Sequence, residues 1–190
     1  AYAAYKCGDP TARNLGRMTL NPLAHFDPIG LVMMLLVRFG WAKPVTINTR
    51  NFKNPRKDEL IVSLAGVATN LIIAFLTLGA MYILQVFTTV DNVILDNILS
   101  SMFFLNLAFF VFNLLPVPPL DGYHVLQCIL GRFTRSAAGF KFFYYFERYG
   151  FAVLIAVLFI NANTGFMSAI VMKLWAGMDA IYSAIFNLFL

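Results

Sequence analysis

The sequence contains few charged residues, few cysteines and few histidines, and the first two shortages each exclude a class of protein. Charged residues make up 12% of the 190 residues, whereas soluble proteins average about 25%. The two cysteines, Cys7 and Cys128, lie far apart and outside any metal-ligand spacing, which excludes a disulfide framework and a zinc knuckle. The two histidines are His25 and His124. The chain is therefore neither an ordinary soluble protein nor a small cysteine-stabilised one.

Hydrophobic residues are abundant instead. They make up 60% of the sequence, and the mean hydropathy is +0.74, values typical of an integral membrane protein. The length predicts a single domain covering residues 1–190. The net charge of +5 does not indicate a nucleic-acid partner, because the basic residues lie in the polar connections between apolar segments. The expected surroundings are a lipid bilayer.

Long uncharged runs predict the membrane helices. The strongest run, Leu60–Leu84, has 25 residues without a charge, and a helix of that length reaches about 37 Å. We expect about four to five membrane helices, with a short or re-entrant helix at Ile29–Val37 and a tight external turn at Asn161–Thr164. The other expected helices are Asn97–Leu115, the short segment Tyr123–Leu130, Tyr149–Ile160 and Gly165–Leu190.

Two segments favour extended backbone. Arg17–Leu20 alternates with the strand period of two, and Pro44–Asn48 is rich in β-branched residues. The predicted fold class is therefore an all-α polytopic membrane protein with a small β element in residues 13–50.

Charge asymmetry predicts the orientation of the spans. Residues 41–58 carry five basic residues, whereas the connection Gln85–Asp96 carries two aspartates and no lysine or arginine. Because cytoplasmic loops are enriched in basic residues, residues 41–58 are predicted to lie inside and Asp91–Asp96 outside. A second basic stretch, with Arg132, Arg135, Lys141 and Arg148, is also predicted to face the cytoplasm.

Asp121 is the most informative single residue. It ends an uncharged run from Asn97 to Leu120, follows Pro118 and Pro119, and precedes Gly122. A carboxylate at membrane depth is costly unless it faces a partner, a water-filled cavity or a metal. The prolines cannot continue a helix, so the backbone that presents the carboxylate is irregular. A simpler alternative is that Asp121 caps the helix that follows.

The residues around Asp121 resemble a known motif. The pattern Asn113-x-x-Pro116-x-x-x-x-Asp121-Gly122 is similar to the NxxPxxxxDG motif of the site-2 protease family, which comprises intramembrane zinc metalloproteases. Gly66-x-x-x-Asn70 resembles the GxxxN motif of that family. The segments 16–22 and 25–30 resemble the region after its first core helix.

The resemblance implies a cofactor and roles for these residues. Asp121 would be a zinc ligand, supported by Pro116 and Gly122 as motif residues. Asn113, Asn70 and Gly66 would bind substrate or polarise the scissile carbonyl; the alternative for both asparagines is a helix-to-helix contact. His25 and His124 are each expected to be structural or, alternatively, to approach a metal.

The family's HExxH motif does not occur in this sequence. In that motif two histidines bind zinc and the glutamate is the general base. The resemblance places HExxH just before Ala1, so one more helix is expected upstream. This chain would then contain no catalytic residue of its own and would be inactive alone.

The function implied is hydrolysis of peptide bonds within or near transmembrane segments of membrane-protein substrates. Such a segment must unwind locally, and the residues around Pro44–Asn48 are a candidate edge for strand addition. The alternative is a non-catalytic membrane protein, either a pseudoprotease that binds transmembrane segments or a transporter with an intramembrane carboxylate. The expected location is a cell (inner) membrane, with the site toward the cytoplasmic face.

Overall fold

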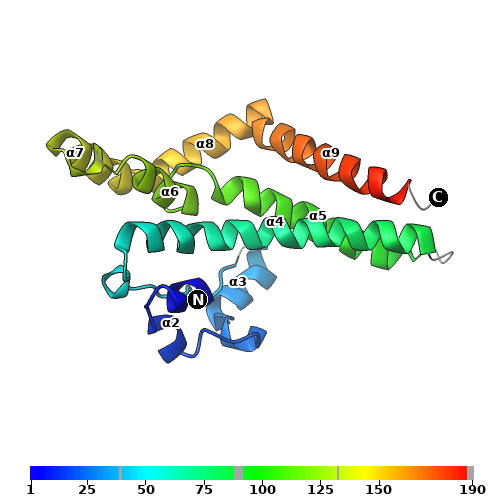
Figure 1. The fold of residues 1–190 in the computed structure, drawn as a ribbon, viewed down its shortest axis with the longest axis horizontal. Coiled ribbons are helices and arrows are strands. Elements are labelled where there is room, and N and C mark those ends of the chain that lie inside the picture. The colour runs from blue at the N-terminus through cyan, green and yellow to red at the C-terminus, as the bar shows by residue number, and fades with distance from the viewer. Residues whose placement is uncertain (39, 88–91, 132, 188–190) are drawn as a thin grey trace. The chain divides into compact units, whose positions relative to one another are not determined.

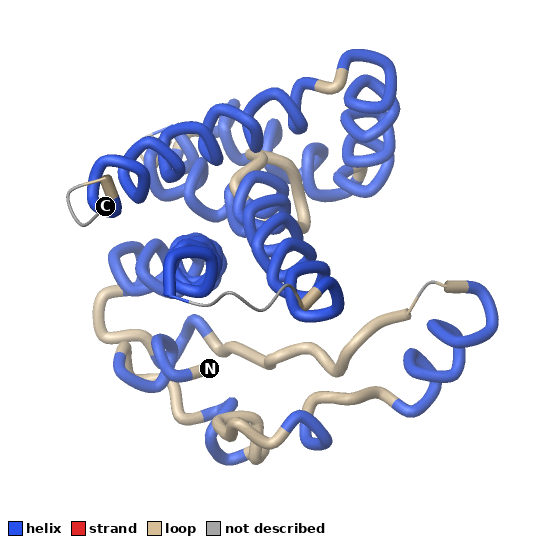
Figure 2. The backbone as a smooth tube through the Cα atoms, turned by 90° about the vertical axis from the view of Figure 1, so that its right-hand side faces the viewer, coloured by secondary structure: helices blue, strands red, loops and turns tan. Residues whose placement is uncertain are grey.

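The computed structural model is all-helical in the residues that it describes, which are 1–38, 40–87, 92–131 and 133–187 (Figure 1). Asp91, Arg132 and residues 188–190, on which some of the expectations above depended, lie outside them. Figure 2 shows helices and loops and no strand in the described part of the chain. The α-helices are α1 (Tyr2–Lys6), α2 (Thr11–Asn14), α3 (Pro28–Val37), α4 (Pro55–Phe87), α5 (Val93–Asn113), α6 (Asp121–Ile129), α7 (Ala137–Arg148), α8 (Gly150–Thr164) and α9 (Phe166–Phe186), and the 3-10 helices are η1 (Pro22–Ala24), η2 (Thr49–Asn51) and η3 (Phe133–Arg135).

The chain divides into two compact units, Ala1–Val62 and Ser63–Leu190. The first unit contains α1 to α3 and the beginning of α4, and the second contains the rest of α4 and α5 to α9. The single-domain organisation stays a prediction.

The small β element predicted for residues 13–50 is not formed. In the described residues of this region, the one β-type pairing is an isolated antiparallel bridge between Phe26 and Ala42. Side chains that favour turns explain the difference. Asn21 caps η1, Asn48 caps η2, and Asp27 accepts from two backbone amides at the start of α3. These local hydrogen bonds give the backbone an alternative to a sheet ladder.

Asp9 holds the first unit together. Its side chain is fully buried and accepts hydrogen bonds from the backbone N–H of Thr11 (3.1 Å) and of Asn48 (2.8 Å) and from Nδ2 of Asn51 (2.8 Å). Burial alone would raise the pKa of this carboxyl, but the hydrogen bonds outweigh it and lower the pKa to about 2. The ionised carboxylate thus ties the segment after α1 to the segment before α4.

We expect Asp9→Asn to lower the midpoint of thermal unfolding in detergent by about 5 °C at pH 7. The folded pKa of about 2 lies below the ordinary value of 3.8. The stabilisation is therefore complete above pH 4 or so and is lost as the pH falls toward 2. The difference between wild type and variant should shrink over that range. Asp96→Asn, which alters an exposed carboxylate, is the control, and equal midpoints for all three proteins at pH 7 would show that Asp9 does not stabilise the unit.

The second unit contains the membrane helices. Three described helices, α4, α5 and α9, are long and apolar enough to cross a membrane, and the bent pair α7 and α8 is a fourth candidate if it forms one span. α4, α5 and α9 pack around Ala74, Leu78, Phe103, Leu107 and Met178. The hydroxyl of Tyr82 in α4 donates to the Asp179 carboxylate in α9 (2.7 Å), and the hydroxyl of Tyr182 donates to the carbonyl of Phe75 (2.9 Å). The prediction of an all-α membrane protein is confirmed.

Two details of the second unit differ from the expectations. Asn161–Thr164 is the last turn of α8, not a tight turn between helices. The chain changes direction at Gly165, which adopts a left-handed φ of 64° that glycine tolerates best. The basic stretch after Leu130 also forms a helix that was not predicted, α7, which Ser136 caps by accepting from the Gly139 amide. A bend of 70° separates α7 from α8.

Candidate active site

Asp121 is presented by an irregular loop between α5 and α6. α5 ends at Asn113 and α6 begins at Asp121, and the peptide bond between Pro118 and Pro119 in this loop is cis. Three short-range backbone hydrogen bonds, ending with the Tyr123 amide donating to the Leu120 carbonyl (3.1 Å), lead the chain into α6. These hydrogen bonds therefore define the backbone conformation of the loop that precedes Asp121.

Apolar packing fixes the loop in place. Val117 and Leu120 are buried together with Leu154 of α8. Gly150, at the start of α8, lies so close to Pro118 that a Cβ on the glycine would come within 2.6 Å of the proline Cβ. Sequence reasoning missed Gly150 and Leu154, because no local pattern connects residues that far along the chain to the loop.

Gly122 allows α6 to begin directly against the end of α5. A Cβ at this position would lie 2.5 Å from the Leu115 carbonyl oxygen and would also meet the carbonyl group of Leu114. Backbone atoms cannot move aside as the end of a flexible side chain can. The glycine after Asp121 is thus a steric requirement of the fold.

The Asp121 carboxylate is half-buried and has no hydrogen-bond partner in the described part of the chain. It is the first residue of α6, the N-cap is Leu120, and no side chain caps this helix. The structure therefore does not show the capping role that the sequence also allowed. Burial raises the pKa of this carboxyl, and the nearby His124 lowers it. A partly desolvated carboxylate with unused lone pairs is suited to a cation.

Gly66 of α4 lies beside this carboxylate. A Cβ on Gly66 would be 3.4 Å from Oδ2 of Asp121, an ordinary contact distance. Asn70 follows one turn later on the same face of α4. Gly66 is six residues after Leu60, where the uncharged run begins, so the carboxylate lies about 9 Å along the apolar part of the helix. The structure thus brings together the two motifs, which are 55 residues apart in the sequence.

Asn70 and Asn113 are both half-buried. Within the described residues, neither side chain makes a hydrogen bond. A helix-to-helix contact would require a hydrogen-bonding partner for the amide, and none is present there. The two amides are therefore free to bind another molecule.

Tyr123 anchors α6 to α7. It is 2% exposed, and its hydroxyl donates to Oε1 of Glu147 (2.7 Å) while accepting from Nε2 of Gln127 (2.7 Å). Its ring also contacts the rings of Phe143 and Phe146, with centroids 5.9 Å and 5.7 Å away. Sequence reasoning missed this anchor; the signal for it was a tyrosine directly after the Asp-Gly pair.

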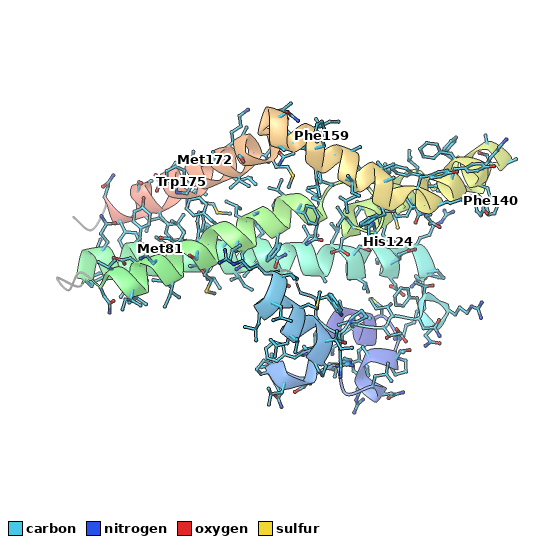
Figure 3. The ribbon with its side chains drawn as sticks, turned by 180° about the vertical axis from the view of Figure 1, so that it is seen from behind. Met81, His124, Phe140, Phe159, Met172 and Trp175 are labelled. Atoms are coloured by element: carbon cyan, nitrogen blue, oxygen red, sulfur yellow. The ribbon has the colours of Figure 1, made fainter. Side chains whose placement is uncertain are left out.

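The two histidines lie in different surroundings. His25 donates from Nε2 to the Thr19 carbonyl oxygen (3.0 Å), which accords with a structural role. His124 lies one turn after Asp121 on α6 (Figure 3) and makes an edge-on ring contact with Tyr123 (5.6 Å). The described residues contain no group of three His, Cys, Asp or Glu that could hold a metal ion. They therefore fit one oxygen ligand of a zinc site, Asp121, and not the whole site.

Comparison with known proteins gives the family. The family model of peptidase family M50 matches residues 79–157, which include Asn113, Pro116, Asp121 and Gly122. "Putative zinc metalloprotease YwhC" of Bacillus subtilis is 39% identical over 198 residues, covering 98% of this chain and 85% of the relative. "Putative zinc metalloprotease Rip2" of Mycolicibacterium smegmatis is 31% identical over 166 residues, covering 85% of this chain and 61% of the relative. No solved structure matches significantly. The chain belongs to peptidase family M50, the site-2 protease family of intramembrane zinc metalloproteases.

Proposed function

We propose that Asp121 is one zinc ligand of an intramembrane protease site, and that an HExxH helix expected before Ala1 supplies two histidine ligands and the general base. The observation that carries this proposal is the half-buried Asp121 carboxylate, which has no hydrogen-bond partner among the described residues and is held by a packed loop. Zinc supplies, when bound, a water whose pKa falls to about 7 and a Lewis acid for the scissile carbonyl.

The residues of this chain bind and orient the other participants. Asp121 contributes an anionic oxygen whose position is restricted by the close backbone contacts at Gly122 and by the packed loop before it. Asn113 and Asn70 donate from their amides to the substrate backbone and to the scissile carbonyl. Gly66 leaves room for an extended peptide beside the carboxylate. These roles follow from the unpaired amides and the small residue near Asp121.

The substrate we propose is a transmembrane segment of another protein, unwound locally so that its peptide bonds become accessible. The support for this substrate is that three described helices are long and apolar enough to cross a membrane. We further propose a cell (inner) membrane with the site toward the cytoplasm. The support is the position of Gly66 near the beginning of the apolar part of α4, just after the basic residues Lys53, Arg56 and Lys57.

Gly66 offers a test of substrate access. We expect Gly66→Leu to lower the rate of cleavage of a transmembrane reporter by about 10-fold or more, because the side chain fills the space beside Asp121. Gly66→Ala should retain most of the activity, since its Cβ makes an ordinary 3.4 Å contact. The assay uses the full polypeptide in detergent or vesicles.

The matched control is Gly177→Leu in α9, where an added Cβ meets nothing within 4 Å. Cleavage should be unaffected by this change. If Gly66→Leu cleaves as fast as Gly177→Leu, the substrate does not pass Gly66 and this part of the proposal is wrong.

A further inference from the structure

α7 has the length and the composition of a helix that lies at a membrane surface, not of a helix that crosses the membrane. Its 12 residues reach about 18 Å, too short for a hydrocarbon core of about 30 Å. Phe143 and Gly139 are its buried residues, and they face the rest of the second unit. Most of the other side chains are exposed.

The exposed surface of α7 and the residues just after it combine aromatic rings with positive charge. We call it the α7 surface; its aromatic members are Phe140 (70% exposed), Phe142 (49%), Tyr144 (53%), Tyr145 (45%) and Tyr149 (55%). So many exposed rings on one short helix are unusual for a face in contact with water. Tyrosine in particular suits the headgroup level of a bilayer, where its ring is apolar and its hydroxyl is hydrated.

The charges on this surface are complementary to anionic headgroups. Lys141 and Arg148 are exposed, and the guanidinium of Arg148 lies over the ring of Tyr149 (5.9 Å). The one acidic residue of the helix, Glu147, accepts hydrogen bonds from Tyr123 and Gln127. Apart from Glu147 itself, Ala137 and Ala138, the exposed side chains of α7 are basic or aromatic.

The path of the chain agrees with a surface position. After α7 the helix axis bends by 70° and the chain continues as α8, Gly150–Thr164, which contains no charged residue. Figure 3 shows Phe140 at the end of the unit opposite Met172 and Trp175 of α9. A charged helix followed by a sharp bend and an uncharged helix is the pattern expected where a chain passes from the interface into the bilayer.

We propose that α7 lies in the plane of the membrane interface and binds anionic phospholipid headgroups through Lys141 and Arg148, with the aromatic rings of the α7 surface inserted at the headgroup level. The α7 surface is then a lipid-binding surface. Because Tyr123 and Glu147 join α7 to α6, it also anchors the helix that carries Asp121.

Depth-dependent fluorescence quenching tests the position. The full polypeptide carries Trp41→Phe and Trp175→Phe, and Phe140→Trp becomes the reporter in vesicles with lipids brominated either near the headgroup or near the chain end. We expect shallow bromines to quench this tryptophan several-fold more strongly. Phe159→Trp on α8, 71% exposed, is the control and should be quenched more by the deep bromines. Equal or deeper quenching at position 140 would mean that α7 and α8 form one broken span. Quenching by neither lipid would mean a protein partner or water, and either result would overturn the proposal.

The same reporter tests the headgroup preference. Brominated phosphatidylglycerol should quench the tryptophan at position 140 several-fold more than brominated phosphatidylcholine at equal mole fraction, since basic residues near the surface attract anionic headgroups. The double change Lys141→Gln and Arg148→Gln should remove the preference, whereas Lys173→Gln in α9 should keep it. Equal quenching by both lipids in the protein that retains Lys141 and Arg148 would overturn the assignment of anionic headgroups.

Discussion

Asp121→Ala is expected to abolish cleavage of a transmembrane substrate, lowering the rate by about 10³-fold or more. The physical reason is that the proposed anionic ligand is lost and the rest of the described chain does not replace it, since no group of three potential ligands occurs there. The measurement is cleavage of a transmembrane reporter by the full polypeptide.

Asp121→Asn separates the effect of the Asp121 charge from that of its side-chain packing, and Asp96→Ala is the control. Asp121→Asn keeps the volume of the side chain and removes its charge, so it should lose activity almost as completely as Asp121→Ala while leaving the thermal unfolding midpoint nearly unchanged. Asp96→Ala removes an exposed carboxylate from the first turn of α5 and should cleave normally. Activity retained in Asp121→Ala would contradict the assignment.

Gly122→Ala is expected to have the second-largest effect, although it adds one methyl group. The new Cβ would meet the backbone carbonyls of Leu114 and Leu115, so α6 could begin only after a shift of its backbone. Overpacking of this kind costs about 3 kcal/mol, and a displacement of about 1 Å at the carboxylate would lower the cleavage rate by about 10²-fold. Thermal unfolding and reporter cleavage measure the two effects.

Gly177→Ala is the matched control for this change. It lies in the middle of α9 with nothing within 4 Å of the new Cβ, and alanine has a helix propensity better than glycine by up to about 1 kcal/mol. It should therefore leave activity unchanged and raise stability slightly. The steric account of Gly122 fails if the two alanine variants behave alike.

The membrane helices were predictable because their signal is local. The uncharged run Leu60–Leu84 falls inside α4, and Asn97–Leu115 falls on α5 with its ends displaced by a few residues. The hydrocarbon core demands length and low charge, and both can be read from consecutive residues. α7 was missed because its apolar and charged residues are mixed, as they are in a helix with two different surroundings.

The prediction of a β element was wrong, also for a physical reason. Alternation at Arg17–Leu20 and the β-branched residues of Pro44–Asn48 indicate extended backbone, but a strand needs a partner with matching register. The nearby Asn21, Asp27 and Asn48 bond to the local backbone instead. A pattern of side chains along one segment does not show which of these competing hydrogen bonds is made.

Asp121 could be singled out from the sequence, whereas the residues that hold its loop and helix in place could not. Asp121 stood out because a carboxylate ends an uncharged run, and the structure places Gly66 beside it. Gly150, Leu154 and the bond between Tyr123 and Glu147 depend on contacts between distant segments. Nothing in the described part of the chain favours the transporter or the non-catalytic alternative.

Zinc content of the full polypeptide tests the central claim most directly. Elemental analysis of protein purified from zinc-containing medium should find about one zinc ion per chain in the wild type and in Asp96→Ala. Changes to residues that only surround a zinc ligand weaken zinc binding by at least about 10-fold. Loss of the ligand itself in Asp121→Ala should therefore weaken zinc binding by more than this. Equal zinc content and affinity in Asp121→Ala and the wild type would contradict the claim that Asp121 is a zinc ligand.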